Sequence, residues 1–150
     1  MDDPKLAAET LAAQALGEVD PTTAALVPPV HMSSTFERRA DGSYVDGRAY
    51  ARADSPGYDE PERLLARLEC GDGAMLFATG MAAASSVFCA LLPGDHVVVS
   101  RVVYFGLRKW LATFATSWGL DVEFTDTADR ACLAAALRPG RTRLVWIETP

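Results

Sequence analysis

The sequence predicts an α/β domain with a mostly parallel sheet. From residue 59 onward, short apolar runs alternate with segments of helical pattern. Gly or Pro stands where most of these segments end. Such alternation is typical of strands connected by helices that cover the faces of a parallel sheet. A chain of 150 residues is long enough for one domain with a hydrophobic core.

The N-terminal third is predicted to hold one helix and a long arm. Residues 4–16 have a helical pattern, with Pro4 near the start and Gly17 at the end. From Gly17 to about Arg52, polar residues, Pro and Gly dominate and no period holds, which predicts an extended segment. Its apolar side chains favour docking on a partner subunit or another domain over disorder. These side chains are Leu26, Val27, Val30, Met32 and Phe36.

The regular elements begin at residue 59, so we divide the chain into 1–58 and 59–150. Asp59 and Glu62 have the spacing of a capping box, which predicts that a helix starts there and runs through the segment LLARLEC. The predicted strands are 74–78, 96–100, 121–125 and 142–148. The predicted helices are 80–92, 104–118 (ending at Gly119) and 129–138, and 93–95 is a predicted turn.

The composition argues against several classes of partner. The net charge of -6 disfavours binding to nucleic acid, because phosphate backbones would be repelled. The sequence shows no basic amphipathic face, which argues against binding to a membrane surface. The longest apolar stretch, 81–92, is too short to span a bilayer. The acidic start of the chain does not resemble a signal peptide. We therefore expect a cytoplasmic location.

The three cysteines are expected to be reduced thiols. Cys70, Cys89 and Cys132 are odd in number and widely spaced, which does not suggest a disulfide framework. Because Cys89 and Cys132 stand among Ala and Leu, we expect them to be buried.

The segment Thr79-Gly80-Met81 is a candidate phosphate site. It stands between a predicted strand and a predicted helix. A helix N-terminus offers unpaired N–H groups and partial positive charge, and Gly80 lets an anion approach the backbone. The alternative is that Thr79 only caps the helix.

Three more residues or pairs could carry chemistry. Tyr50 and Arg52 could bind a phosphate, although Arg52 could instead pair with Asp54 on the surface. Tyr104 follows a strand, where α/β sheets bind ligands, and could stack on a planar ring. The alternative for Tyr104 is a core aromatic beside Phe105 and Trp110. Glu148 also ends a strand, and its alternative is a capping or salt-bridged acid.

Other chemistries find no support in the pattern. His31 and His96 lack partners at ligand spacing and there is no C-x-x-C, so no metal site is expected. The chain has no G-x-S-x-G, G-x-G-x-x-G or Walker A motif. A nucleotide-phosphate-binding α/β domain stays open as one alternative.

Six motifs, in this order, carry a resemblance to a known family: VPPVHMSSTF, YARADSP, ERLLARLE, LFATGMAAASSVFCALLPGDHVVV, VVYFGLRKWL and VWIETP. The order resembles the Cys/Met-metabolism enzymes that depend on pyridoxal 5'-phosphate (PLP). These include cystathionine gamma-synthase, cystathionine gamma-lyase, methionine gamma-lyase and the homoserine sulfhydrylases. The resemblance runs from about Glu9 to Pro150. It implies the PLP-dependent transferase fold of type I, of which this chain would hold the N-terminal arm and the first half of the large domain.

The resemblance also implies roles for the candidate residues. Tyr50 and Arg52 match the Tyr-x-Arg that reaches the PLP phosphate of a neighbouring subunit. Gly80 and Met81, after Thr79, match the pair whose N–H groups hold that phosphate. Tyr104 matches the tyrosine that stacks on the ring and assists proton transfer. Glu148 matches an acid near the cofactor.

The sequence departs from the family in three places. Ser55-Pro56-Gly57 stands where Asn-Pro-Thr is common, and Tyr104-Phe105-Gly106-Leu107 stands where Tyr-Gly-Gly-Thr is common. Thr79 stands where Ser is usual. The only lysines are Lys5 and Lys109, and neither matches the family's Schiff-base lysine.

The resemblance implies a PLP enzyme of transsulfuration, a lyase or transferase in cysteine and methionine metabolism. The expected reaction is gamma-elimination or gamma-replacement on cystathionine, methionine or an O-acyl-homoserine. The expected assembly is a dimer that shares its active sites, within a homotetramer. The 150 residues alone are expected to be inactive without that lysine. The alternative is a truncated, non-catalytic copy that acts as a binding or dimerising module.

Overall fold

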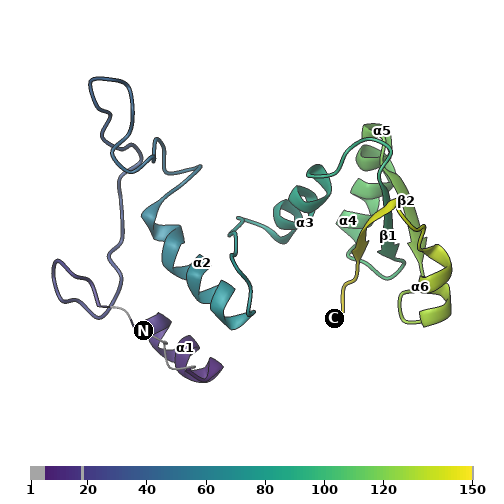
Figure 1. The fold of residues 1–150 in the computed structure, drawn as a ribbon, viewed down its shortest axis with the longest axis horizontal. Helices are drawn as coiled ribbons and strands as arrows, with labels where there is room; N and C mark the ends of the chain where they lie inside the picture. The colour runs from purple at the N-terminus through teal and green to yellow at the C-terminus, as the bar shows by residue number, and fades with distance from the viewer. Residues whose placement is uncertain (1–5, 18, 150) are drawn as a thin grey trace. The chain divides into compact units, whose positions relative to one another are not determined.

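The chain forms two compact units, residues 1–76 and 77–150. The computed structural model describes residues 6–17 and 19–149 (Figure 1). Each unit is considered by itself. Lys5 and the start of the predicted helix 4–16 lie outside the described residues.

The N-terminal unit consists of two helices and the arm. Helix α1 (Ala8–Gln14) continues into the 3-10 turn η1 (Ala15–Gly17), within the predicted helix. The arm that follows contains two isolated antiparallel bridges, Thr35 with Tyr50 and Arg38 with Tyr44, and otherwise no helix or strand in its described part. Turns at residues 21–23, 40–41, 45–46 and 51–53 interrupt the segment.

Helix α2 (Pro56–Leu68) starts earlier than predicted, and the capping box is wrong. Ser55 is the N-cap, and its hydroxyl accepts a hydrogen bond from the N–H of Gly57. Pro56 has no N–H to leave unpaired, so it suits the first helical position. Asp59 instead accepts from Arg48 at 2.7 Å, and Glu62 accepts from the N–H of Leu76 at 2.8 Å. The two acids are thus used for tertiary contacts.

The C-terminal unit is an α/β layer with a three-stranded parallel sheet. The strands are β1 (His96–Ser100), β2 (Asp121–Thr125) and β3 (Thr142–Trp146), in the order β2-β1-β3. The helices are α3 (Gly80–Cys89), α4 (Phe105–Trp110), the π-helical turn η2 (Leu111–Ala115), α5 (Thr116–Trp118) and α6 (Arg130–Ala136). The predicted α/β class and parallel sheet are confirmed.

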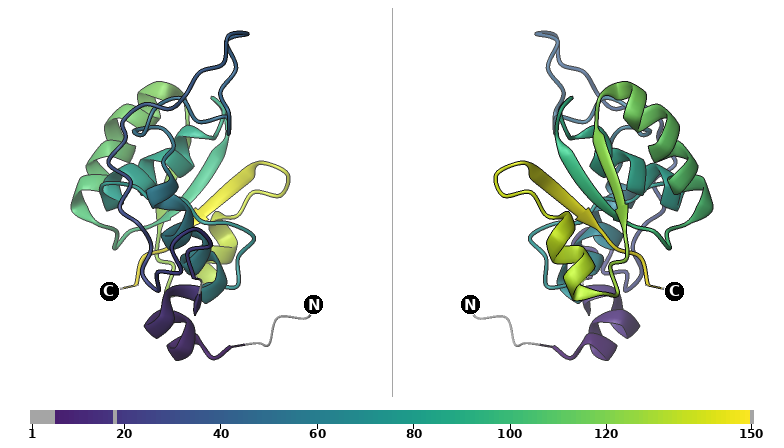
Figure 2. Two further views of the ribbon diagram at one scale, coloured as in Figure 1. Left: turned by 90° about the vertical axis from the view of Figure 1, so that its left-hand side faces the viewer. Right: turned by 90° about the vertical axis from the view of Figure 1, so that its right-hand side faces the viewer.

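Helices cover both faces of this sheet. Figure 2 shows the continuous segment α4–η2–α5 on one side of the strands and α6 on the other. Right-handed crossovers from β1 to β2, and from β2 back past β1 to β3, require this arrangement. As the central strand, β1 is buried along its whole length. On the α3 and α4 side, Phe88, Leu107 and Leu111 pack with Val97 and Val99 in the core.

The strand predicted at 74–78 is absent. These residues have no regular structure, and Met75, Leu76 and Phe77 are 77%, 42% and 40% exposed. An apolar run becomes a strand only where a neighbouring strand pairs with its N–H and C=O groups. No such neighbour pairs with 74–78 among the described residues.

The burial predicted for two cysteines is also wrong. Cys70, Cys89 and Cys132 are all exposed free thiols. Cys89 is the last residue of α3, whose core positions are taken by Ala84 and Phe88. Cys132 lies in the first turn of the short helix α6.

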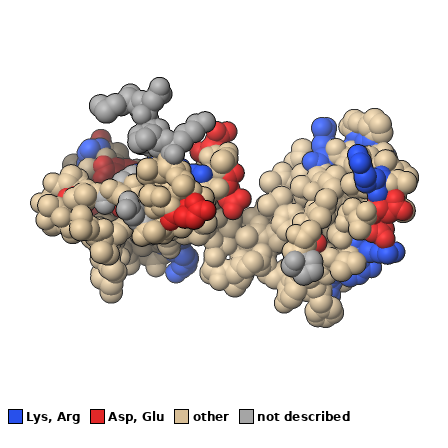
Figure 3. Space-filling model, turned by 90° about the horizontal axis from the view of Figure 1, so that it is seen from below, with Lys and Arg blue, Asp and Glu red and all other residues tan. Residues whose placement is uncertain are grey.

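A polar network crosses the sheet at the amino ends of its strands. His96 is fully buried, with Nδ1 at 2.9 Å from the Thr142 hydroxyl and Nε2 at 3.3 Å from Glu123. Arg138 binds both Asp121 and Glu123. Acidic and basic side chains accordingly lie side by side on the surface of this unit (Figure 3). Within the described residues, no helix is long and apolar enough to cross a membrane.

Candidate functional site

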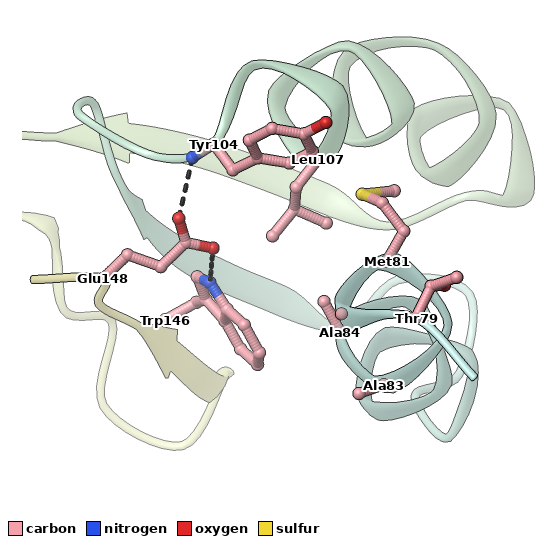
Figure 4. A pocket seen from close by; sticks show the side chains of 9 residues that line it. Thr79, Met81, Ala83, Ala84, Tyr104, Leu107, Trp146 and Glu148 are labelled. Carbon is pink, nitrogen blue, oxygen red and sulfur yellow. Dashed lines mark hydrogen bonds between the residues drawn. The ribbon is translucent and has the colours of Figure 1, made fainter. Parts of the chain in front are cut away.

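A pocket of about 470 Å³ lies in the C-terminal unit, where β1 and β3 end and α3 begins (Figure 4). It brings together Thr79, Gly80, Met81, Tyr104 and Glu148, all five candidates that belong to this unit. The carboxyl ends of parallel strands meet at one edge of the sheet, which explains why residues so far apart in sequence converge. The pocket is completed by Ala83, Ala84, Leu107 and Trp146.

The start of α3 forms the polar end of the pocket. Thr79 is the N-cap, and its hydroxyl accepts from the N–H of Ala82 at 3.0 Å. Within the described residues, the N–H groups of Gly80 and Met81 donate to no acceptor. A Cβ added at Gly80 would meet nothing within 4 Å, so the space beside this backbone is open. Thr79 therefore caps the helix, which was the alternative to a phosphate site. The cap still leaves two N–H groups available for an anion.

Tyr104 forms the aromatic wall. It is the N-cap of α4, and its side chain is 62% exposed, so it is not a core aromatic. A Cβ at Gly106 would lie only 2.7 Å from Cε1 of Tyr104, which places the ring against the Gly106 backbone. An exposed aromatic ring at a pocket can stack on a planar ligand.

Glu148 connects the two strand ends. Its Oε2 accepts from the N–H of Tyr104 at 2.7 Å, and its Oε1 accepts from Nε1 of Trp146 at 3.0 Å (Figure 4). The carboxylate therefore holds the start of α4 next to the end of β3. This is close to the capping alternative that the sequence left open.

Tyr50 and Arg52 belong to the N-terminal unit and form a local pair. The Arg52 guanidinium lies over the Tyr50 ring, 5.2 Å from its centroid, and donates to the Tyr50 hydroxyl at 3.4 Å. The surface pairing of Arg52 with Asp54 is not observed, because Asp54 pairs with Arg48 at 3.4 Å. Among the described residues no acid pairs with Arg52, so its charge is free for another partner.

Sequence reasoning missed the apolar wall of the pocket. Trp146 and Leu107 were not candidates, although each had a detectable signal. Trp146 stands two residues before Glu148, which places both on one face of an extended segment. Leu107 stands three residues after Tyr104, on the same face of a helix.

Comparison with known proteins gives matches along almost the whole chain. Residues 9–150 match the model of the family described as Cys/Met metabolism PLP-dependent enzyme. Cystathionine gamma-synthase from Mycobacterium tuberculosis is 40% identical over 134 residues, which are 87% of this chain and 34% of that protein. Cystathionine gamma-lyase from Bos taurus is 36% identical over 129 residues, 86% of this chain and 31% of that protein.

A solved structure has the same fold. Cystathionine gamma synthase from Xanthomonas oryzae pv. oryzae, in complex with cystathionine, superposes with a TM-score of 0.83 at 32% identity. The match covers 96% of this chain and 37% of that structure. The chain thus spans about a third of the length of each of these three relatives.

Proposed function

Since the chain belongs to the Cys/Met metabolism PLP-dependent enzymes, we propose that the pocket of the C-terminal unit is part of the PLP site. The observation that carries the proposal is the open space beside Gly80 together with two unpaired N–H groups at the start of a ten-residue helix. The whole protein would then act in transsulfuration, by gamma-elimination or gamma-replacement. Its substrate would be cystathionine, methionine or an O-acyl-homoserine.

The residues present fit the cofactor. The N–H groups of Gly80 and Met81 would hold the phosphate, supported by the positive end of the helix dipole. The ring of Tyr104 would face the pyridine ring, and Leu107 and Trp146 would exclude water from one side of the pocket. When bound, PLP supplies an electron sink for carbanion chemistry at the substrate's alpha carbon. The Tyr104 hydroxyl, on an exposed side chain, would hold or move a proton close to the substrate.

Tyr50 and Arg52 would complete a phosphate site in a neighbouring subunit. Arg52 keeps its charge unpaired by any acid among the described residues, and the arm around it exposes large apolar side chains. Leu26, Val30 and Met32 are 80%, 84% and 88% exposed. Such a surface fits docking on a second copy, which supports a dimer that shares its sites. The homotetramer stays a prediction.

The lysine that carries PLP would be neither Lys5 nor Lys109. Lys109 is exposed on α4, two residues beyond the pocket-lining Leu107, and so points away from the pocket. Lys5 lies outside the described residues. The division at residue 58 into arm and cofactor domain, the transferase activity and the cytoplasmic location stay predictions as well.

The proposal is tested by substitutions at Gly80 in the full-length protein. Gly80→Val fills the open space and should weaken PLP binding about 10-fold or more, because a charge-assisted hydrogen bond of the phosphate is lost. Gly73→Val is the matched control, since Gly73 also has open space around its Cβ and no positive φ. Dissociation constants come from titration with PLP. Equal affinity in the wild type and Gly80→Val would remove this pocket as the phosphate site.

A further inference from the structure

The carboxylate of Glu148 is already used within the protein. Each of its oxygens accepts one hydrogen bond, from the Tyr104 backbone at 2.7 Å and from the Trp146 indole at 3.0 Å. Tyr104 makes no side-chain capping bond at the start of α4. Glu148 reaches across from β3 and accepts from the N-cap residue instead. Loss of this contact would free the start of α4, and with it the backbone that carries the Tyr104 ring.

The ring itself is seated by a glycine. The Tyr104 ring lies so close to Gly106 that a Cβ there would stand 2.7 Å from Cε1 and 3.4 Å from both Cδ1 and Cζ. Real Cβ atoms do not tolerate such a contact, so any side chain at position 106 would push the ring aside. Because Tyr104 is 62% exposed, the ring has room to move and the helix would not need to deform.

We propose that Glu148 and Gly106 are positioning residues that act through Tyr104. Glu148 fixes the backbone of Tyr104, and Gly106 leaves the space in which its ring rests. Glu148 would then have no direct contact with the cofactor, contrary to the cofactor-binding role that the resemblance implied. The inference rests on the proposed role of Tyr104 in the PLP site.

The test is a double-mutant cycle on the PLP dissociation constant of the full-length protein. Glu148→Ala and Gly106→Ala should each raise this dissociation constant about 10-fold in the wild-type background, because a displaced ring loses its stacking on the cofactor. In the Tyr104→Ala background each should change it by less than about 2-fold, since no ring remains to be positioned. Glu148→Gln keeps one acceptor oxygen and should give an intermediate value.

Matched controls separate this effect from general damage. Glu69 is exposed and Gly73 has open space around its Cβ, so Glu69→Ala and Gly73→Ala should leave PLP affinity unchanged. Ala favours a helix more than Gly does, so Gly106→Ala should fold. The absorption spectrum of bound PLP provides a second readout, and Glu148→Ala and Gly106→Ala should shift it in the same direction as Tyr104→Ala.

The possible failures are distinct. If Glu148→Ala weakens PLP binding as much without the Tyr104 ring as with it, Glu148 contacts the cofactor and the inference is overturned. The same holds if Glu148→Ala has no effect on the wild-type background. If Tyr104→Ala and Gly80→Val both leave PLP affinity unchanged, the proposed function itself fails.

Discussion

At the scale of single residues, Tyr104 combines an exposed ring with a fixed backbone. Its N–H donates to Glu148, while the residue lines the pocket and is 62% exposed. This division lets the ring and the hydroxyl contribute separately. Stacking needs only the ring, whereas proton transfer needs the hydroxyl.

Two substitutions should therefore give different phenotypes. Tyr104→Phe should keep PLP affinity within about 2-fold but lower kcat by about 10²-fold, the effect expected for loss of an acid or base. Tyr104→Ala should lower kcat and also weaken PLP binding. Steady-state kinetics and PLP titration measure the two effects. Wild-type behaviour in both variants would mean that Tyr104 has no part in the site.

Residue types at strand ends were predictable from the sequence, whereas their partners were not. Tyr104 and Glu148 share one pocket because the neighbouring parallel strands β1 and β3 end at the same edge of the sheet, and the start of α3 adds Thr79, Gly80 and Met81. The hydrogen bond from the Tyr104 backbone to Glu148 spans 44 positions and follows no local spacing. Similarly, no local sequence pattern predicts that Asp59 pairs with Arg48.

At the scale of elements, α6 shows a cap whose strength depends on pH. Asp129 is the N-cap, and the N–H groups of Ala131 and Cys132 donate to its carboxylate, which lowers the pKa of Asp129 below its usual value. A carboxylate with a lowered pKa stabilises the folded state above the pKa of the unfolded side chain. The stabilisation is lost as the pH falls through the lower pKa of the folded state.

Asp129→Ala should therefore lower the thermal unfolding midpoint at neutral pH, and the gap to wild type should narrow below about pH 3.9, the ordinary pKa of Asp. Asp129→Asn is the control, because its amide oxygen caps the helix but does not titrate. Unfolding followed by circular dichroism across pH measures both gaps. If the difference in unfolding midpoint between wild type and Asp129→Ala is the same at every pH, the charge of Asp129 does not contribute to capping α6.

The sequence predicted which segments form helices and strands better than it predicted where helix α2 starts or which cysteines are buried. Strands β1, β2 and β3 were found because each apolar run is bounded by turn residues and is paired within the unit. The apolar run 74–78 has the same pattern, but whether it becomes a strand depends on a neighbouring strand that pairs with its backbone. The run itself carries no signal of such a partner. Helix α2 begins before the Asp59–Glu62 pattern, because Ser55 serves as the N-cap and Pro56 suits the first helical position.

At the scale of the whole molecule, the proposed PLP site is shared, because one subunit's arm would complete another subunit's pocket. This can be tested with Arg52→Ala and Gly80→Val in the full-length protein, two variants that should bind PLP more weakly, assayed at a limiting PLP concentration. A hybrid dimer would contain one site with both residues intact and one site with neither. At that PLP concentration the hybrids should be more active than either parent homodimer.

The hybrids should be purified by two different affinity tags, and unexchanged parents mixed at the same concentration serve as the control. If Arg52 and Gly80 instead act on a site within the same subunit, a different outcome is expected. Each subunit of the hybrid would then carry one defect, and the hybrids would be no more active than the parents.

The position of the cofactor is best measured by a crystal structure of the full-length protein with PLP. We expect the phosphate within hydrogen-bond distance of the N–H groups of Gly80 and Met81, and the pyridine ring against Tyr104. We also expect that the lysine bonded to PLP is neither Lys5 nor Lys109. PLP bound elsewhere, with the Gly80 and Met81 N–H groups facing water, or PLP bonded to Lys109, would show that this pocket is not the cofactor site.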